Sequence, residues 1–144
     1  SVRLYLRDTG LVTAFTNGDP TSALRDRDLE TNLARIAAFD HTMRFAYGVN
    51  AANGNDVEPT VEYWESRHGT VDFVFELEGT PVPIALAYQP PVDEKRAALD
   101  AFLETYETPL GFLVTGDTVG NDTAIQQTEN GIIQLPYWLY LLLC

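Results

Sequence analysis

The chain has 144 residues, and 21 acidic side chains against nine basic ones give it a net charge of −12 and a pI of about 4.3. This length predicts one domain, residues 1–144, with a sizeable hydrophobic core. This excess of acidic residues argues against a basic nucleic-acid-binding patch. Cys144 is the single cysteine, which excludes an internal disulfide and indicates a reducing compartment.

Lysine is almost absent, since Lys95 is the one lysine and the other basic residues are arginines. An acidic, lysine-poor surface is typical of proteins from halophilic archaea.

The apolar run 137–143 is far shorter than a membrane helix, which needs about 20 residues. We therefore expect a cytoplasmic protein without a membrane segment.

The N-terminal third predicts mainly helix and loop. The chain starts at Ser1 in patterned sequence, which suggests a piece of a longer protein, and Asp8 is placed to cap a brief helix to about Phe15. Residues 16–22 predict a loop. A helix is expected over 24–39, because four apolar residues recur at helical spacing: Leu29, Leu33, Ile36 and Ala37.

The middle of the chain predicts strands. Residues 45–49 are expected to form one strand, followed by a loop over 50–59 that is rich in Asn, Gly and Asp. Three further strands are expected in succession, separated by turns at His68-Gly69 and Glu78-Gly79: 61–66, 70–77 and 82–88. Strand alternation would place Asp72 and Glu76 on one face, and Ala85 and Ala87 together on the next strand.

The C-terminal part predicts a helix over 93–106 with Asp93 as its cap and one apolar face: Leu99, Phe102, Leu103 and Tyr106. A strand over 110–115 would pair in parallel after this helix. Residues 124–128 and 132–135 flank Glu129-Asn130-Gly131, a hairpin signal. The apolar residues after Pro136 predict a terminal core element.

Several motifs resemble one family, the nuclease-fold domain of unknown function that follows the ATPase core of many bacterial and archaeal AAA+ ATPases. That domain is related to the PD-(D/E)XK nucleases. Its pattern, Tyr-Trp-Arg…Gly-x-Glu-Val-Asp-Phe-Val…Pro-Ile-Glu-Val-Lys, is matched at Tyr63-Trp64, Gly69, Val71-Asp72-Phe73-Val74 and Pro83-Ile84. Its entry motif, Tyr-x-x-Asp-x-Gly-Leu, is matched by Tyr5, Asp8, Gly10 and Leu11, and 136–140 resemble its closing segment.

The chain departs from this family where the resemblance places the chemistry. Thr70 replaces a glutamate, Ala85 replaces the second acid, and Ala87 replaces the lysine. Thr31 stands where a helix glutamate would complete the metal shell, and the neighbouring Glu30 is rotated about 100° around the helix. Asp72 alone is a poor Mg²⁺ site, since Mg²⁺ is usually held by one or two carboxylates with water and phosphate. The resemblance thus implies a vestigial site of Asp72, Ala85, Ala87 and Thr31.

Two alternatives remain open. A rebuilt Mg²⁺-dependent nuclease site would use Asp72, Glu76 and possibly Lys95, with Glu62 or Glu65 reaching from the neighbouring strand. A nucleic-acid-binding module would require a clustered arginine face. The arginines near residue 26 instead alternate with aspartates, which leaves nucleic-acid binding without support.

The expected fold is therefore α/β, with a restriction-endonuclease-like mixed central sheet of 45–49, 61–66, 70–77, 82–88 and 110–115, flanking helices and a C-terminal hairpin. The expected function is a catalytically degenerate accessory domain, the C-terminal fragment of an AAA+ type ATPase, that acts in partner binding or regulation. Its partner would be a protein or its own N-terminal ATPase domain. The chain has no P-loop, so ATP is expected in the parent chain and no cofactor in this domain.

Overall fold

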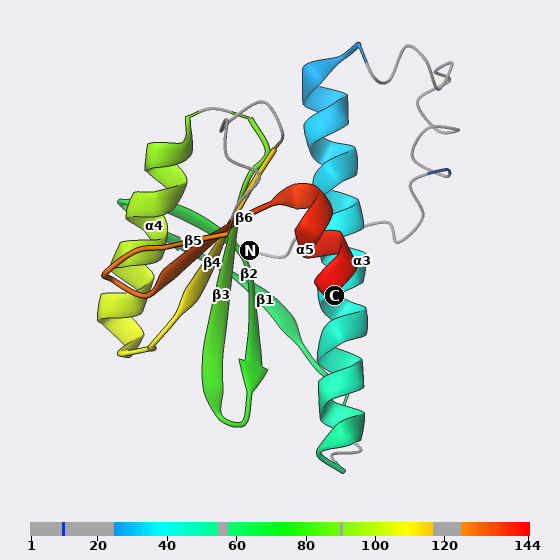
Figure 1. Ribbon diagram of the computed structural model, residues 1–144, viewed down its shortest axis with the longest axis vertical. Coiled ribbons are helices and arrows are strands. Elements are labelled where there is room, and N and C mark those ends of the chain that lie inside the picture. Colours follow the sequence, from blue (N-terminus) through cyan, green and yellow to red (C-terminus); the bar gives the residue numbers. More distant parts are fainter. Residues whose placement is uncertain (1–9, 11–24, 55–57, 90, 117–124) are drawn as a thin grey trace.

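A six-stranded mixed β-sheet with helices on both faces organises the chain (Figure 1). The computed structural model describes residues 10, 25–54, 58–89, 91–116 and 125–144. The strand order is β1-β2-β3-β4-β6-β5, which confirms the predicted α/β class. The brief helix expected over 8–15 and the loop expected over 16–22 lie outside the described residues, apart from Gly10.

The sheet begins with an antiparallel meander of β1 (Val61–Ser66), β2 (Gly69–Leu77) and β3 (Thr80–Ala87). The helix α4 (Val92–Tyr106) then carries the chain to β4 (Gly111–Thr115), which pairs with β3 in parallel as predicted. The predicted hairpin is also confirmed, as β5 (Gln126–Gln127) pairs with β6 (Ile132–Pro136). Beyond the prediction, β6 joins the central sheet in parallel with β4, and the chain ends in α5 (Tyr137–Leu143).

The long helix α3 (Arg27–Ala52) corrects the prediction of a helix ending near 39 and a strand over 45–49. It begins at Asp26, whose carboxylate accepts the backbone N–H groups of Asp28 and Leu29 at 3.0 and 3.1 Å. The aromatic and β-branched residues near 45–49 favour strands locally, but propensity is a weak prior. The helix continues because its buried side chains recur every fourth residue across this stretch.

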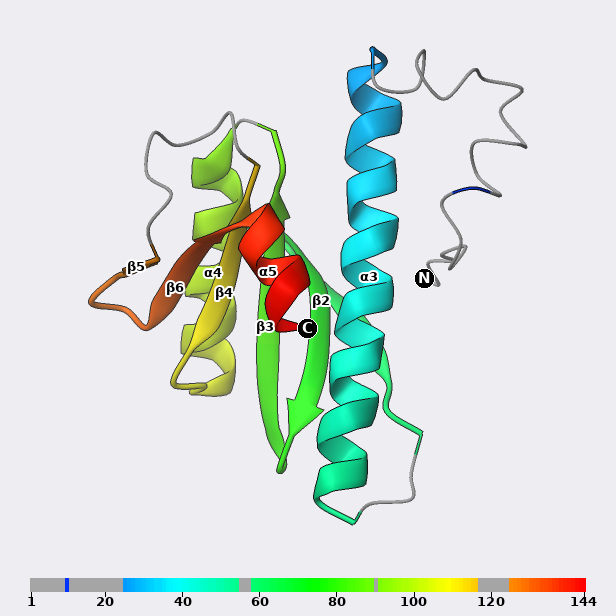
Figure 2. The same cartoon turned by 45° about the vertical axis from the view of Figure 1, so that its right-hand side comes forward.

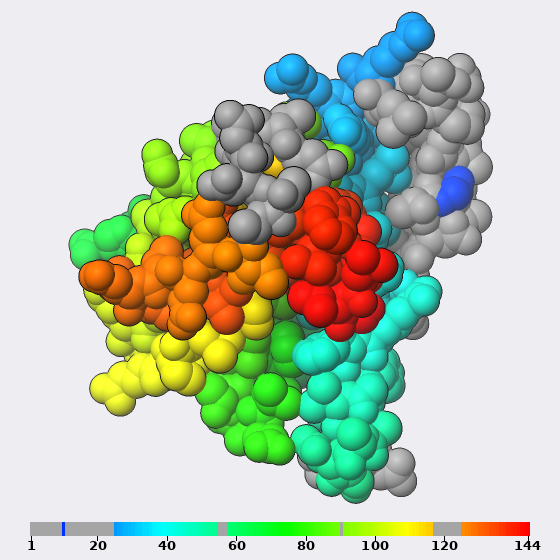
Figure 3. Space-filling model, in the orientation of Figure 1, coloured from blue at the N-terminus to red at the C-terminus, as the bar shows by residue number. Residues whose placement is uncertain are grey.

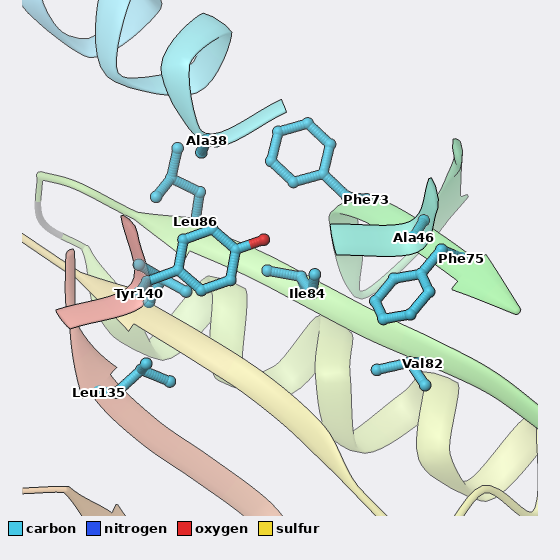
Figure 4. Close-up of a cluster of buried hydrophobic side chains, with 10 residues drawn as sticks. Ala38, Ala46, Phe73, Phe75, Val82, Ile84, Leu86, Leu135 and Tyr140 are labelled. Carbon is cyan, nitrogen blue, oxygen red and sulfur yellow. The ribbon is translucent and has the colours of Figure 1, made fainter. Parts of the chain in front are cut away.

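The buried stripe of α3 also differs from the predicted one. The expected residues Leu29, Leu33, Ile36 and Ala37 are only half-buried. The stripe on the sheet consists of small side chains: Ala34, Ala38, Thr42 and Ala46. Large sheet residues supply the volume instead, and Figure 4 shows Ala38 and Ala46 beside Phe73 and Phe75. The helix therefore contributes gaps into which the aromatic rings of β2 fit.

The two faces of the sheet have separate cores. The helices α3 and α5 cover one face, while α4 covers the other (Figure 2). On α4, Leu99, Phe102 and Leu103 are buried as predicted, whereas Tyr106 is exposed and packs its ring on Phe102. The predicted cap is wrong, because α4 begins after Pro91 with no side-chain cap and Asp93 lies in its first turn. Within the described ranges, no helix has the length and apolarity to cross a membrane.

We predict that Ala38→Leu destabilises the protein by about 1–3 kcal/mol, because Ala38 is fully buried against the sheet and overpacking strains a core. The matched control is Ala37→Leu, one residue away on the half-buried face, with an expected change of about 0.5 kcal/mol or less. Urea unfolding measures both. A larger effect at Ala37 would mean that the sequence-predicted stripe faces the sheet.

Candidate functional site

The strand β2 contains a β-bulge at Asp72. Glu62 pairs with Val74 and Trp64 pairs with Val71, so two β2 residues lie opposite one β1 residue. A bulge changes the direction of the following side chains. Val71 accordingly packs in the core under α4, whereas Phe73 packs in the core under α3. The simple alternation expected along 70–77 is therefore wrong.

Asp72 is buried, with 2 % of the residue exposed, and its carboxylate is contacted from three structural elements. Its Oδ2 accepts the backbone N–H of Leu86 on β3 at 2.8 Å and the ammonium of Lys95 on α4 at 2.6 Å. Its Oδ1 lies 3.4 Å from Nε of Arg35 on α3. One side chain thus joins the sheet to a helix on each face.

The local geometry explains the bond to Leu86. The pairing of β2 with β3 extends from Leu77 and Thr80 to Phe73 and Ile84. The Leu86 N–H lies two residues beyond this pairing, and the Asp72 carboxylate accepts it in place of a strand carbonyl. Since a buried backbone N–H requires a partner, Asp72 completes the hydrogen bonding of β3 next to the bulge.

Lys95 is held in place by two oxygens. Besides its contact with Asp72, its ammonium donates to the carbonyl of Thr70 at 3.1 Å. Lys95, which the rebuilt-site alternative groups with Asp72, thus lies in direct contact with that carboxylate. The side chains of Lys95 and Arg35 are only 20 % and 29 % exposed, so both cations are partly removed from water.

The charges of Asp72, Lys95 and Arg35 sum to +1, which is unfavourable for a divalent cation. A Mg²⁺ ion on Asp72 would lie close to two positive charges, and these repel it more strongly in a partly buried site than in water. An ion bound to Oδ2 would also have to displace the ammonium of Lys95, which is 2.6 Å away. This arrangement fits a structural ion pair better than a metal site.

The two alanines of β3 lie beneath α4. Ala85 and Ala87 are 0 % and 2 % exposed, and they belong to one core with Ala98, Leu99 and Leu113. An acid or a lysine at either position would be buried among apolar side chains, at a large desolvation cost. Both positions are therefore filled by apolar packing against α4.

The other predicted site residues make different contacts. Thr31 donates its hydroxyl to the carbonyl of Arg27 within α3 at 2.8 Å, and Glu30 accepts the hydroxyl of Tyr88 at 3.1 Å. Glu76 is exposed, and its Cα pairs with that of Pro81 towards the β2–β3 turn. Across the ranges that the structure describes, no three His, Cys, Asp or Glu side chains lie together as metal ligands would.

Sequence reasoning missed Arg35 and the amide of Leu86. A signal for Arg35 exists, since it follows Thr31 by four residues and therefore lies one turn further along the same helix face. The backbone amide of Leu86 has no sequence signal, because its availability depends on where the bulge interrupts the pairing of the strands.

Comparison with known proteins gives no match to a protein-family model, to a curated protein or to a solved structure.

We predict that Lys95→Met lowers the free energy of unfolding by about 3 kcal/mol, because the buried carboxylate of Asp72 loses its nearest cation. Arg44→Met is the matched control. It removes a cation from Asp40 at an equal distance of 2.6 Å, but Arg44 is 66 % exposed, so a loss below about 1 kcal/mol is expected.

The double variant Asp72→Asn/Lys95→Met completes the test. Chemical denaturation of both single variants and the double variant should give a coupling of about 1 kcal/mol or more, because the two groups contact each other directly. Additive effects would show that the ion pair does not stabilise the fold.

Proposed function

We propose that this chain is a nuclease-fold domain that has lost its chemistry and serves as an accessory domain of an AAA+ type ATPase, in partner binding or regulation. The observation that carries the proposal is the Asp72 carboxylate, which is occupied by Leu86 N–H, Lys95 and Arg35. ATP would bind in the parent chain, and the parent chain would be cytoplasmic. The family resemblance motivates the ATPase, and the ion cluster supports the loss of catalysis.

The loss of catalysis follows from charge and packing together. Metal-dependent phosphodiester cleavage needs a metal that activates water and stabilises the charge developing on the phosphate. In this chain the one acid retained from the family pattern is neutralised by cations, and the second acid and lysine positions are filled by Ala85 and Ala87 under α4. Restoring a metal would require both the ion cluster and the α4 interface to rearrange.

A rebuilt nuclease is the second candidate, and the Lys95–Asp72 contact is the observation that favours it. A lysine beside an acid is part of what such a site needs, and a substrate phosphate could supply further metal ligands. Against it stand the exposed position of Glu76 and the second cation, Arg35. A nucleic-acid-binding module has weaker support still, given the net charge of −12.

A surface for a partner is offered by α5, all of whose side chains are apolar or aromatic. Three of them are exposed: Trp138 at 44 %, Leu142 at 75 % and Leu143 at 59 %. Neighbouring exposed apolar side chains of this kind commonly mark a protein contact surface. Figure 3 shows α5 in red at the surface between α3 and the C-terminal strands.

We predict no Mg²⁺- or Mn²⁺-dependent cleavage of single-stranded DNA, duplex DNA or RNA above the level of Asp72→Asn. The reason is that Asp72 already has cationic partners at 2.6 and 3.4 Å. Gel assays in low and high salt measure this. The non-catalytic assignment would be refuted, in favour of the rebuilt site, if the wild type shows metal-dependent cleavage and a correctly folded Asp72→Asn variant does not.

We further predict that Leu142→Glu removes proteins that co-purify with the tagged natural chain in its own cells, because a charge disrupts an apolar contact. Tyr106→Glu is the control, since Tyr106 is also a large exposed side chain, at 49 %, but lies on α4, on the opposite face of the sheet. If the wild type, Leu142→Glu and Tyr106→Glu recover equal amounts of co-purifying protein, α5 does not bind a partner.

A further inference from the structure

An apolar cavity of about 570 Å³ lies between α3, the β2–β3 hairpin, β4, β6 and α5. This volume lies within the range of small-molecule sites, which is about 300–1,000 Å³. Its wall is formed mainly by apolar side chains, among them Phe45, Phe75, Val82, Ile84, Phe112 and Leu135. Figure 4 shows four of these around one space, together with Tyr140. The cavity is on the face of the sheet opposite α4, so it is separate from the alanine positions of β3.

Two hydroxyl groups meet on the cavity wall. Thr42 and Tyr140 both line the cavity, are 0 % and 3 % exposed, and have their hydroxyl oxygens 2.5 Å apart. The Thr42 hydroxyl donates to the carbonyl of Ala38 at 2.7 Å. Since a hydroxyl has one proton, Tyr140 donates to Thr42, and its phenol oxygen is left as an acceptor that the thiol of Cys144 and a ligand hydroxyl would share.

The thiol of Cys144 also lines the cavity and interacts with the Tyr140 hydroxyl, so it joins the cluster of Thr42 and Tyr140. Burial raises the pKa of Tyr140 well above its ordinary value, and burial also raises the pKa of Cys144. All three groups are therefore uncharged near neutral pH. A few convergent polar groups in an apolar pocket fix the orientation of a ligand.

Glu78 has the one carboxylate side chain among the lining residues, and it is exposed at the turn between β2 and β3. Its carboxylate lies 3.4 Å from the side-chain amide of Asn53, at the C-terminal end of α3. Thr42 lies eleven residues before Asn53, or about 16 Å along the helix. The cavity thus extends along α3 from buried hydroxyls to an exposed acid, which disfavours an anionic ligand.

We propose that this cavity binds an uncharged, elongated apolar molecule with one hydroxyl group, of the medium-chain alcohol class. The alkyl chain packs against the aromatic and aliphatic wall, and the hydroxyl donates to the phenol oxygen of Tyr140. A carboxylate of the same length cannot donate and is repelled by Glu78 and the net charge of −12. The ligand proposal does not depend on the ATPase assignment, but the cavity shares Leu143 with the partner surface proposed on α5.

The probes are 1-octanol, 1-decanol, decyl methyl ether and decanoate, each titrated by calorimetry below its solubility limit. The two alcohols should bind saturably, and decanol should bind about fifteenfold more tightly than octanol, because each of its two additional methylenes gives roughly a fourfold gain on burial. The ether and decanoate should bind at least several-fold more weakly than decanol. Saturable binding of decanoate as tight as that of decanol would overturn the proposal.

Two matched pairs of variants locate the site. Tyr140→Phe should weaken decanol several-fold and leave the ether unchanged, whereas Tyr137→Phe should change neither, because the Tyr137 hydroxyl donates to Ala34 and does not line the cavity. Leu77→Trp should fill the cavity and abolish binding, while Val61→Trp, half-buried beside the same core, should not. If Leu77→Trp does not fold, the comparison of Tyr140→Phe with Tyr137→Phe locates the binding site.

Absence of saturable binding for every probe would overturn the proposal and point to an apolar side chain of a partner as the occupant. Binding that is equal in Tyr140→Phe and the wild type would also contradict it, because the hydroxyl group would then have no role. Since these measurements use neither metal nor nucleic acid, their outcome is distinct from that of the cleavage assays.

Discussion

The fold depends on one buried carboxylate that is contacted from both faces of its sheet. Asp72 accepts a backbone N–H from β3 and faces Lys95 from α4 and Arg35 from α3. Breaking such a buried pair is costly, because the remaining charge has no compensation. The same contacts that hold α3 and α4 to the sheet also neutralise the acid. The structural role of Asp72 and its unsuitability for metal therefore have one cause.

The sequence predicted the parts of the fold whose signals are local. Turns with Gly bounded the three central strands, and the periodicity of α4 identified three of its buried residues correctly. Residues 45–49 were assigned wrongly because their aromatic and β-branched character favours a strand, while their packing continues the stripe of Ala38, Thr42 and Ala46. The buried face of α3 was missed because small residues carry little hydrophobic signal.

The candidate site was also predictable only in the parts that have a local sequence signal. Asp72, Ala85 and Ala87 were identified from motif positions, and Lys95 from its place at the start of the following helix. The bulge, the amide of Leu86 and the reach of Arg35 depend on register and helix placement, which one sequence does not specify. The cavity was missed for the same reason, since its lining comes from segments between Thr42 and Cys144 that meet only in the folded chain.

The most direct test of the central claim is a Mn²⁺ titration followed by the backbone amide NMR signals of Leu86 and Asp72. Mn²⁺ broadens signals near its binding site, and the Leu86 amide donates to the carboxylate in question at 2.8 Å. The account predicts that these two signals keep their width while those of exposed acidic segments, such as Glu104 and Glu107, broaden weakly. Selective, saturable broadening of Leu86 and Asp72 would contradict the account, because the carboxylate would then be available to a metal ion.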